Sequence, residues 1–229
     1  PSVRVHVFST FFYTRLASGT VQQCSVDIFA RDLLLVPVNE HSHWYLIAVW
    51  NPSAVLRPGA REDDPKSSPR GKRAPLDAET TCTVIILDSL GSRHRPAAIE
   101  RVRRFVASEA SGRTETPQPV SALYARVPQQ PNLADCGCFV IENARRLVAA
   151  DGPAAIAAML ARQDLSSWYD AADVGRTVRS SLLAAIHRIA GDAPRVSLDL
   201  ADAGSSDVEE VTFTEHVAML EAAQQPRPL

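Results

Sequence analysis

The sequence predicts an α+β fold in which helices pack on a mixed central sheet. The strongest observation is residues 43–50 (HWYLIAVW), which are apolar on both alternating faces, as is typical of a strand buried on both sides. A second apolar run, residues 83–88 (TVIILD), is β-branched and ends in a carboxylate. Amphipathic helical patterns follow it, so we expect helices to cover the faces of the sheet.

The remaining elements of the first half are shorter. Residues 9–19 predict a helix, because a serine or threonine at the start can cap it and Gly19 can close it. Residues 33–38 form a short apolar run, which predicts a strand that ends near Pro37.

The second half is mostly helical. Residues 96–109 predict an amphipathic helix with proline in its first turn, and residues 122–127 a further strand. The segment that starts at Cys136 has a helical composition and reaches a clear break at residues 151–153, after which 154–161 can form a short helix. Residues 173–190 carry one apolar helical stripe, made of Val174, Val178, Leu182, Ile186 and Ile189.

Composition divides the chain into a folded domain, residues 1–191, and a tail, residues 192–229. The tail is polar and acidic, so we expect it to be mostly disordered, with one short helix near 212–223. Residues 52–80 are rich in Pro, Arg, Asp and Ser with charges of both signs, which predicts a solvated, disordered insertion between two strands.

Charge and cysteine content exclude several classes of function. The net charge of the 229 residues is -2, which gives no pull toward nucleic acid or anionic membranes, and no apolar run reaches the roughly 18 residues of a membrane span. We therefore expect neither nucleic acid nor membrane as a partner. Cysteines 24, 82, 136 and 138 form no CxxC pair, which argues against a zinc site and a disulfide framework and favours a reducing compartment.

Four residues offer the parts of a cysteine nucleophile's site, which needs a base, a group that orients the base, and oxyanion donors. His43 opens one predicted strand and Asp88 closes the next, so antiparallel pairing would bring them together. Gln130 precedes Cys136 by six residues, and Cys136 opens a predicted helix whose dipole favours a thiolate. Each residue alone has an ordinary structural explanation; the ordered combination HW…LDSL…Q-x5-CG is far more specific.

This combination resembles the SUMO-specific (sentrin-specific) cysteine proteases of the ubiquitin-like-protein-specific protease family. The resemblance extends over FSTFFYTRL, VDIFARDLLLVPVNEHSHWYLIAVW, ILDSLG and VPQQPNLADCGCFV, and it is greatest to the branch that trims SUMO chains. It implies a papain-like cysteine-protease fold, with residues 1–191 as the catalytic domain. It further implies hydrolysis of the isopeptide bond after the modifier's C-terminal Gly-Gly, without cofactor or metal.

The resemblance also implies partners and a location. The partners are SUMO and SUMO-conjugated proteins or SUMO chains. The enzyme is expected to be a monomer in the nucleus, with the cytoplasm as the alternative location. Four residues receive catalytic roles from it: His43 as general base, Asp88 as the carboxylate that orients it, Gln130 in the oxyanion hole, and Cys136 as nucleophile. Trp44 matches the tryptophan that covers the narrow tunnel for the Gly-Gly tail; simple core packing is the alternative for it.

Three features leave alternatives open. Family members carry an upstream Trp-Leu-Asn-Asp-like stretch that forms the tunnel's other wall, but the tryptophans here are 44, 50 and 168, so an N-terminally truncated chain is one explanation. Cys138 is expected to be a buried packing residue, with a resolving or redox role as the alternative, and His41 to be a surface or loop residue. The rival functions are a NEDD8-specific protease, an acyltransferase of the bacterial-effector type, and a truncated, catalytically weak SUMO-binding module.

Overall fold

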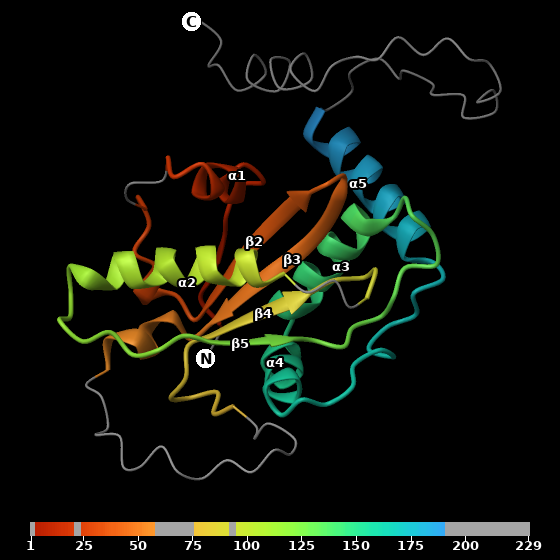
Figure 1. Cartoon of the computed structure of the whole chain (residues 1–229). Helices are drawn as coiled ribbons and strands as arrows, with labels where there is room; N and C mark the ends of the chain where they lie inside the picture. The colour runs from red at the N-terminus through yellow and green to blue at the C-terminus, as the bar shows by residue number, and fades with distance from the viewer. Residues whose placement is uncertain (1–2, 21–23, 58–75, 92–94, 191–229) are drawn as a thin grey trace, which may run out of the picture. The chain divides into compact units, whose positions relative to one another are not determined.

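The computed structural model describes residues 3–20, 24–57, 76–91 and 95–190 (Figure 1). The chain divides at residue 186 into two units, and the sheet and the site described below belong to the first. The second unit contains the predicted tail and its helix at 212–223, which lie outside the described residues. Within the part of the chain that is described, no helix combines the length and the apolar character needed to cross a membrane.

A five-stranded mixed sheet forms the centre, with the strands in the order β1-β2-β3-β4-β5. The strands are β1 (Val5–Val7), β2 (Leu33–Glu40), β3 (His43–Trp50), β4 (Thr83–Leu87) and β5 (Ser121–Tyr124). The two inner pairs around β3 are antiparallel, whereas β1 pairs with β2 and β5 pairs with β4 in parallel. The predicted mixed sheet is therefore confirmed.

Helices cover both faces of this sheet (Figure 1). They are α1 (Phe12–Ala17), α2 (Pro96–Ser111), α3 (Cys136–Val148) and α4 (Gly152–Leu160), with short 3-10 turns at Ile28–Ala30 and Pro52–Leu56. The last helix, α5 (Val174–Ala190), packs on α3. One core cluster joins α1 and α2 to alternate residues of the strands, and a second cluster joins α3 and α4 to the residues between them. In β3, Tyr45 and Ile47 belong to the first cluster, and Leu46 and Ala48 to the second. The prediction of a strand buried on both sides is confirmed.

Several predicted boundaries are wrong. Strand β2 runs past Pro37 to Glu40; β1 pairs only with its first three residues, so Pro37 lies where one edge of β2 is open and a missing N–H is tolerated. Strand β5 ends at Tyr124 rather than at residue 127. Helix α1 starts at Phe12 without a side-chain cap, but Gly19 closes it in the left-handed conformation, with φ +72°, as expected.

A two-residue turn joins β2 to β3 and sets the position of the first residue of β3. Glu40 pairs with His43 across the hairpin, and both turn residues, His41 and Ser42, have positive φ (53° and 57°). This is the type I′ geometry that matches the twist of a hairpin. His41 is exposed in this turn, as predicted, while His43 enters the sheet.

The prediction of a solvated insertion over residues 52–80 is wrong at both ends. Pro52–Leu56 forms a 3-10 turn in which Pro52, Ala54 and Val55 are buried, because its apolar residues Ala54, Val55 and Leu56 pack in the first core cluster. At the other end, the Leu76 amide donates to Leu160 O at 3.1 Å, and Trp50 Nε1 donates to Ala78 O at 2.8 Å. Residues 58–75 lie outside the described part of the chain.

The predicted helix at 173–190 is present as α5, but only part of its apolar stripe is buried. Val174 and Val178 pack with Phe139 and Tyr169 in a third cluster. Leu182 and Ile186, further along the stripe, are 42% and 59% exposed. The start of α5 is therefore the part that is anchored against α3.

Candidate active site

The antiparallel pairing of β3 and β4 brings His43 and Asp88 together. Leu46 pairs with Leu87, so the start of β3 and the end of β4 lie at the same end of the sheet. His43 Nε2 lies 2.7 Å from Asp88 Oδ1, and both side chains are buried. The sequence-based expectation that these two strand ends meet is thus met in the structure.

The two nitrogens of the His43 imidazole have different surroundings. A carboxylate can only accept hydrogen bonds, so Nε2 carries a proton and donates it to Asp88. Nδ1 is buried and has no hydrogen-bond partner among the described residues. A neutral imidazole held in this way presents a free lone pair at Nδ1, which is what a general base needs.

Arg95 holds the opposite side of the Asp88 carboxylate. Its Nη2 and Nε donate to Asp88 Oδ2 at 2.9 and 3.3 Å, and its guanidinium lies 4.0 Å from the centre of the Tyr45 ring. The backbone amide of Leu90 donates to Asp88 Oδ1 at 3.0 Å. Charge-assisted bonds to both oxygens fix the carboxylate in place. Arg95 is not predicted from the sequence, because nothing in its local pattern marks a residue at a helix start as a partner of Asp88.

Glu40 extends this network, with its Oε2 3.9 Å from Arg95 Nη1. The hydroxyls of Tyr13 and Tyr45 donate to it at 2.9 and 2.7 Å, and Arg101 Nη1 lies 3.2 Å from it. Burial, followed by the hydrogen bond to Glu40, raises the pKa of Tyr45 above its ordinary value. Tyr45 therefore stays a neutral donor, and its ring supports the Arg95 guanidinium.

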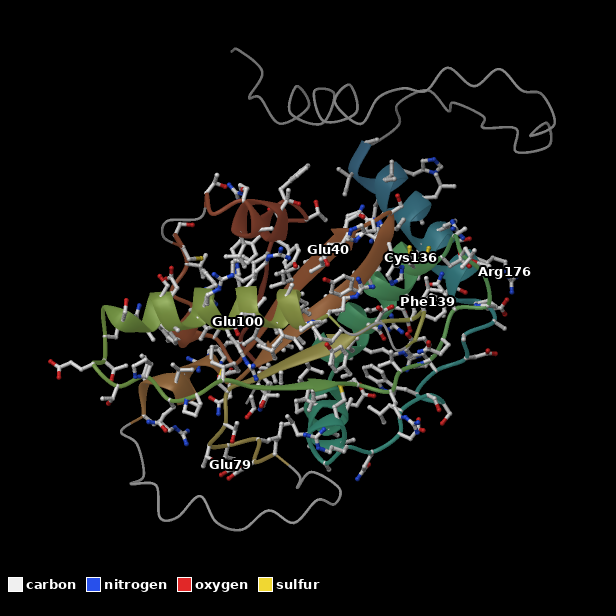
Figure 2. The ribbon with its side chains drawn as sticks, viewed as in Figure 1. Glu40, Glu79, Glu100, Cys136, Phe139 and Arg176 are labelled. Carbon is white, nitrogen blue, oxygen red and sulfur yellow. The ribbon has the colours of Figure 1, made fainter. Side chains whose placement is uncertain are left out.

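Cys136 is the first residue of α3 and is buried (Figure 2). Helix α3 packs against β3, and a Cβ placed on Gly137 would lie 3.8 Å from Cδ1 of Trp44, in ordinary contact. This contact brings the start of α3 beside the start of β3, where His43 lies. The first amides of a helix have no partner within the helix, so they are available to donate to an oxyanion that forms beside Cys136.

Two adjacent glutamines, Gln129 and Gln130, have different roles in the loop before α3. Gln129 Nε2 donates to the backbone oxygens of Val127 and Asp88 at 2.8 and 3.3 Å. Gln130 Nε2 donates to Asn132 O at 2.5 Å, and its Oε1 accepts from the Ser89 hydroxyl at 2.7 Å. Of the two carboxamides, that of Gln130 is thus the one whose NH₂ faces the loop leading into α3, consistent with its position six residues before Cys136.

Asp135, the N-cap residue of α3, is tied to the start of α5. Its carboxylate accepts from Asn132 Nδ2 at 2.7 Å and pairs with Arg179 Nη1 at 2.6 Å. The hydrogen bond from Asn132 is the main reason that the pKa of Asp135 lies below its ordinary value, and Arg179 adds to it. A Cβ built on Gly175 would overlap this carboxylate, so α5 can approach only because residue 175 is glycine.

Gly175→Ala is therefore expected to displace Asp135 and with it the residue that follows, Cys136. We expect a loss of about 1–3 kcal/mol in the free energy of unfolding, as for an overpacked site, together with a lower turnover number per folded molecule. Urea unfolding and turnover measure the two effects. Gly112→Ala is the matched control, because a Cβ there meets no atom within 4 Å. Equal behaviour of the two variants would contradict this account of α5.

The other cysteines lie in different surroundings. Cys138 packs with Phe139, Tyr169 and the start of α5, as expected for a packing residue, and burial raises the pKa of its thiol. Burial raises the pKa of Cys82 to about 12, so this thiol is protonated at neutral pH. Cys24 is half-buried. Over the described residues, no group of three or more His, Cys, Asp or Glu side chains could hold a metal ion.

The mixed sheet covered by helices, with a thiol opening one helix and a buried His–Asp pair at the sheet's end, defines a papain-like cysteine-protease fold. The chain belongs to the Ulp1 protease family, C-terminal catalytic domain, whose model matches residues 1–168.

Two curated relatives agree with this membership, and a solved structure shares the fold. Ubiquitin-like-specific protease 2 of Schizosaccharomyces pombe is 27% identical over 161 residues, covering 59% of this chain and 25% of that protein. The protein of the same name from Saccharomyces cerevisiae is 28% identical over 157 residues, covering 62% of this chain and 15% of that protein. The chain thus spans about a quarter or less of the length of these curated relatives. A structure described as that of a de-sumoylating protease shares the fold, with a TM-score of 0.56 and 22% identity over 82% of this chain and 73% of that one.

Proposed function

We propose that this chain is a cysteine-type isopeptidase that removes SUMO from lysine side chains, with Cys136 as nucleophile. The observation that carries the proposal is the buried His43–Asp88 pair at 2.7 Å, whose Nδ1 is left without a partner among the described residues. This pair lies at one end of the sheet. Helix α3, which begins at Cys136, packs against strand β3 of the same sheet. Family membership and the names of the relatives support the choice of a ubiquitin-like modifier.

Acylation uses three of the four residues directly. His43 Nδ1 takes the proton of the Cys136 thiol, and the thiolate attacks the carbonyl carbon of the modifier's last glycine. The amide of Cys136 and Nε2 of Gln130 stabilise the oxyanion of the tetrahedral intermediate. The C–N bond then breaks, the lysine amine leaves with the proton from His43, and a thioester remains on Cys136.

Deacylation returns the enzyme to its starting state. His43 takes a proton from water, and the resulting nucleophile attacks the thioester carbon through a second oxyanion. The C–S bond breaks, the thiolate recovers its proton from the imidazolium, and the modifier leaves with a free carboxylate. Asp88 keeps its charge throughout, orienting the imidazole and stabilising the imidazolium.

Trp44→Ala tests the proposed cover over the Gly-Gly tail. Trp44 is half-buried beside Gly137, a position from which an indole can cover a tail without side chains. We expect turnover of a SUMO substrate to fall about tenfold or more, since a misplaced substrate loses near-attack geometry, while Cys136 still reacts with iodoacetamide. If Trp44 is instead core packing, the variant loses roughly 3–5 kcal/mol of stability and both reactivities fall together.

Trp50→Ala is the matched control for that comparison. Trp50 is also half-buried, lies at the other end of β3, and donates its indole N–H to Ala78 O. Its loss should lower the melting temperature while the folded fraction keeps its specific activity. A Trp44 variant that behaves in the same way would reject the tunnel role.

Reaction with modifier probes tests the proposed activity itself. The purified chain is incubated with SUMO and NEDD8 that carry a C-terminal vinyl sulfone, and with SUMO linked to a fluorophore. We expect labelling and turnover with SUMO, and none with the Cys136→Ala variant. Faster labelling by NEDD8 would support the NEDD8-specific alternative. A folded chain that binds SUMO but shows no labelling would be a binding module. Action on SUMO chains and a nuclear location stay predictions.

A further inference from the structure

Ser89 connects two parts of the site, the segment with Asp88 and the loop with Gln130. It directly follows Asp88, which holds the base, and the residue is 3% exposed. Its backbone oxygen accepts from the amide of Gln130 at 2.8 Å, and its hydroxyl contacts Gln130 Oε1 at 2.7 Å. One turn after β4 therefore supports both the carboxylate behind His43 and the carboxamide assigned to the oxyanion hole.

The contacts of Gln130 fix which way round its carboxamide lies. Asn132 O is a backbone carbonyl and can only accept, so the atom 2.5 Å from it must be Nε2 of Gln130. The other end of the carboxamide is then Oε1, and Ser89 must be the donor to it. One N–H of Nε2 bonds to Asn132, and the second N–H is left for an oxyanion.

We propose that Ser89 is a positioning residue that locks the Gln130 carboxamide with its NH₂ toward the oxyanion. The inference rests on the proposed function. Without the hydroxyl, Oε1 is a buried acceptor that has lost its partner, a state that costs free energy. The contact with Asn132 O then holds the carboxamide alone, and its terminal torsion, which is broad, is less restrained. The second N–H of Nε2 therefore points less consistently toward the oxyanion and stabilises it less.

This role is separable from that of the His–Asp pair. Among the hydrogen bonds of the described residues, the Ser89 side chain bonds to Gln130, and none joins it to His43 or Cys136. Loss of the hydroxyl should therefore impair oxyanion stabilisation and leave the reactivity of the thiolate toward a small reagent unchanged. Alkylation forms no oxyanion, so it reports on the thiolate alone.

A double-mutant cycle tests the proposal. Ser89→Ala, Gln130→Ala and the double variant are made in a Cys24→Ser background, since Cys24 is the half-buried thiol and would compete for the reagent. For Ser89→Ala we expect about a tenfold lower kcat on the SUMO-fluorophore substrate, the effect of one hydrogen bond, with KM and the iodoacetamide rate within about twofold. Gln130→Ala should lower kcat by about 10²–10³. The double variant should be no slower than Gln130→Ala, because nothing is left to position.

The outcomes separate this inference from the proposed function. The positioning role would be overturned if Ser89→Ala lowered kcat by the same factor in the presence and in the absence of Gln130. It would also be overturned if Ser89→Ala kept the wild-type kcat. A fall in alkylation that follows a lower melting temperature would show a structural role and overturn it as well. If the Cys24→Ser parent is inactive on every SUMO substrate, both the proposed function and the inference are refuted. If the parent is active but the losses in kcat from the two substitutions are additive, the inference alone is refuted.

Discussion

Replacing Cys136 with alanine is expected to abolish cleavage of SUMO conjugates while the fold and SUMO binding persist. The thiol is the atom that forms the acyl intermediate, so its removal should lower kcat by at least about 10⁴-fold. Alanine at the start of α3 keeps the helix and its buried position. Turnover of a SUMO-fluorophore, binding of uncleaved conjugate and the melting temperature measure the three quantities.

The other three cysteines serve as controls for that result. Cys24→Ala, Cys82→Ala and Cys138→Ala should each keep activity and probe labelling. The two buried thiols among them have raised pKa values, about 12 for Cys82 and above the ordinary value for Cys138, so neither supplies a thiolate at neutral pH. Labelling that disappears only when one of these three is changed would reassign the nucleophile.

Asp88→Asn should produce the second-largest loss, about 10²–10⁴ in kcat with little change in SUMO binding. A neutral carboxamide cannot stabilise the imidazolium, and an NH₂ turned toward His43 would impose the wrong tautomer. The same change leaves the nearly buried Arg95 facing an uncharged group, so we also expect lower stability. The kcat must therefore be expressed per folded molecule, from turnover and an unfolding curve on the same sample.

Asp164→Asn is the matched control for loss of an aspartate that pairs with arginine. Asp164 bonds to Arg126 at 2.9 Å, but both side chains are largely exposed, where an ion pair contributes little. Its replacement should leave kcat and stability close to the wild-type values. If Asp88→Asn turns over at the wild-type rate, Asp88 is a turn residue and another group orients His43.

The sequence alone predicts the parts of the fold that repeat a pattern. The two long apolar strands were placed correctly because burial on both faces leaves an unbroken apolar run in the sequence. Their antiparallel pairing then brings His43 and Asp88 to one end of the sheet. The three-residue strand β1 was missed, since so short a segment cannot show an alternation.

Contacts between distant segments account for what the sequence did not predict. The role of Arg95 follows from its bond to Asp88 and from its contact with the ring of Tyr45. The sequence around Arg95 indicates neither of these contacts. Ser89 belongs to the LDSL motif, but its bond to Gln130 depends on the position of a loop that lies some forty residues later in the chain. The buried Pro52–Leu56 turn was hidden by the polar residues that follow it.

The lengths of the connections on either side of β3 suggest where the molecule can be rebuilt. At the end with His43 and Asp88, β2 and β3 are joined by two residues in left-handed conformations. At the opposite end, the path from Trp50 to Thr83 takes more than thirty residues. Grafted domains, affinity tags or new chain termini therefore belong between Arg57 and Leu76, beyond the turn and the segment that pack on the core. One residue added at Ser42 would instead change the register that aims the imidazole.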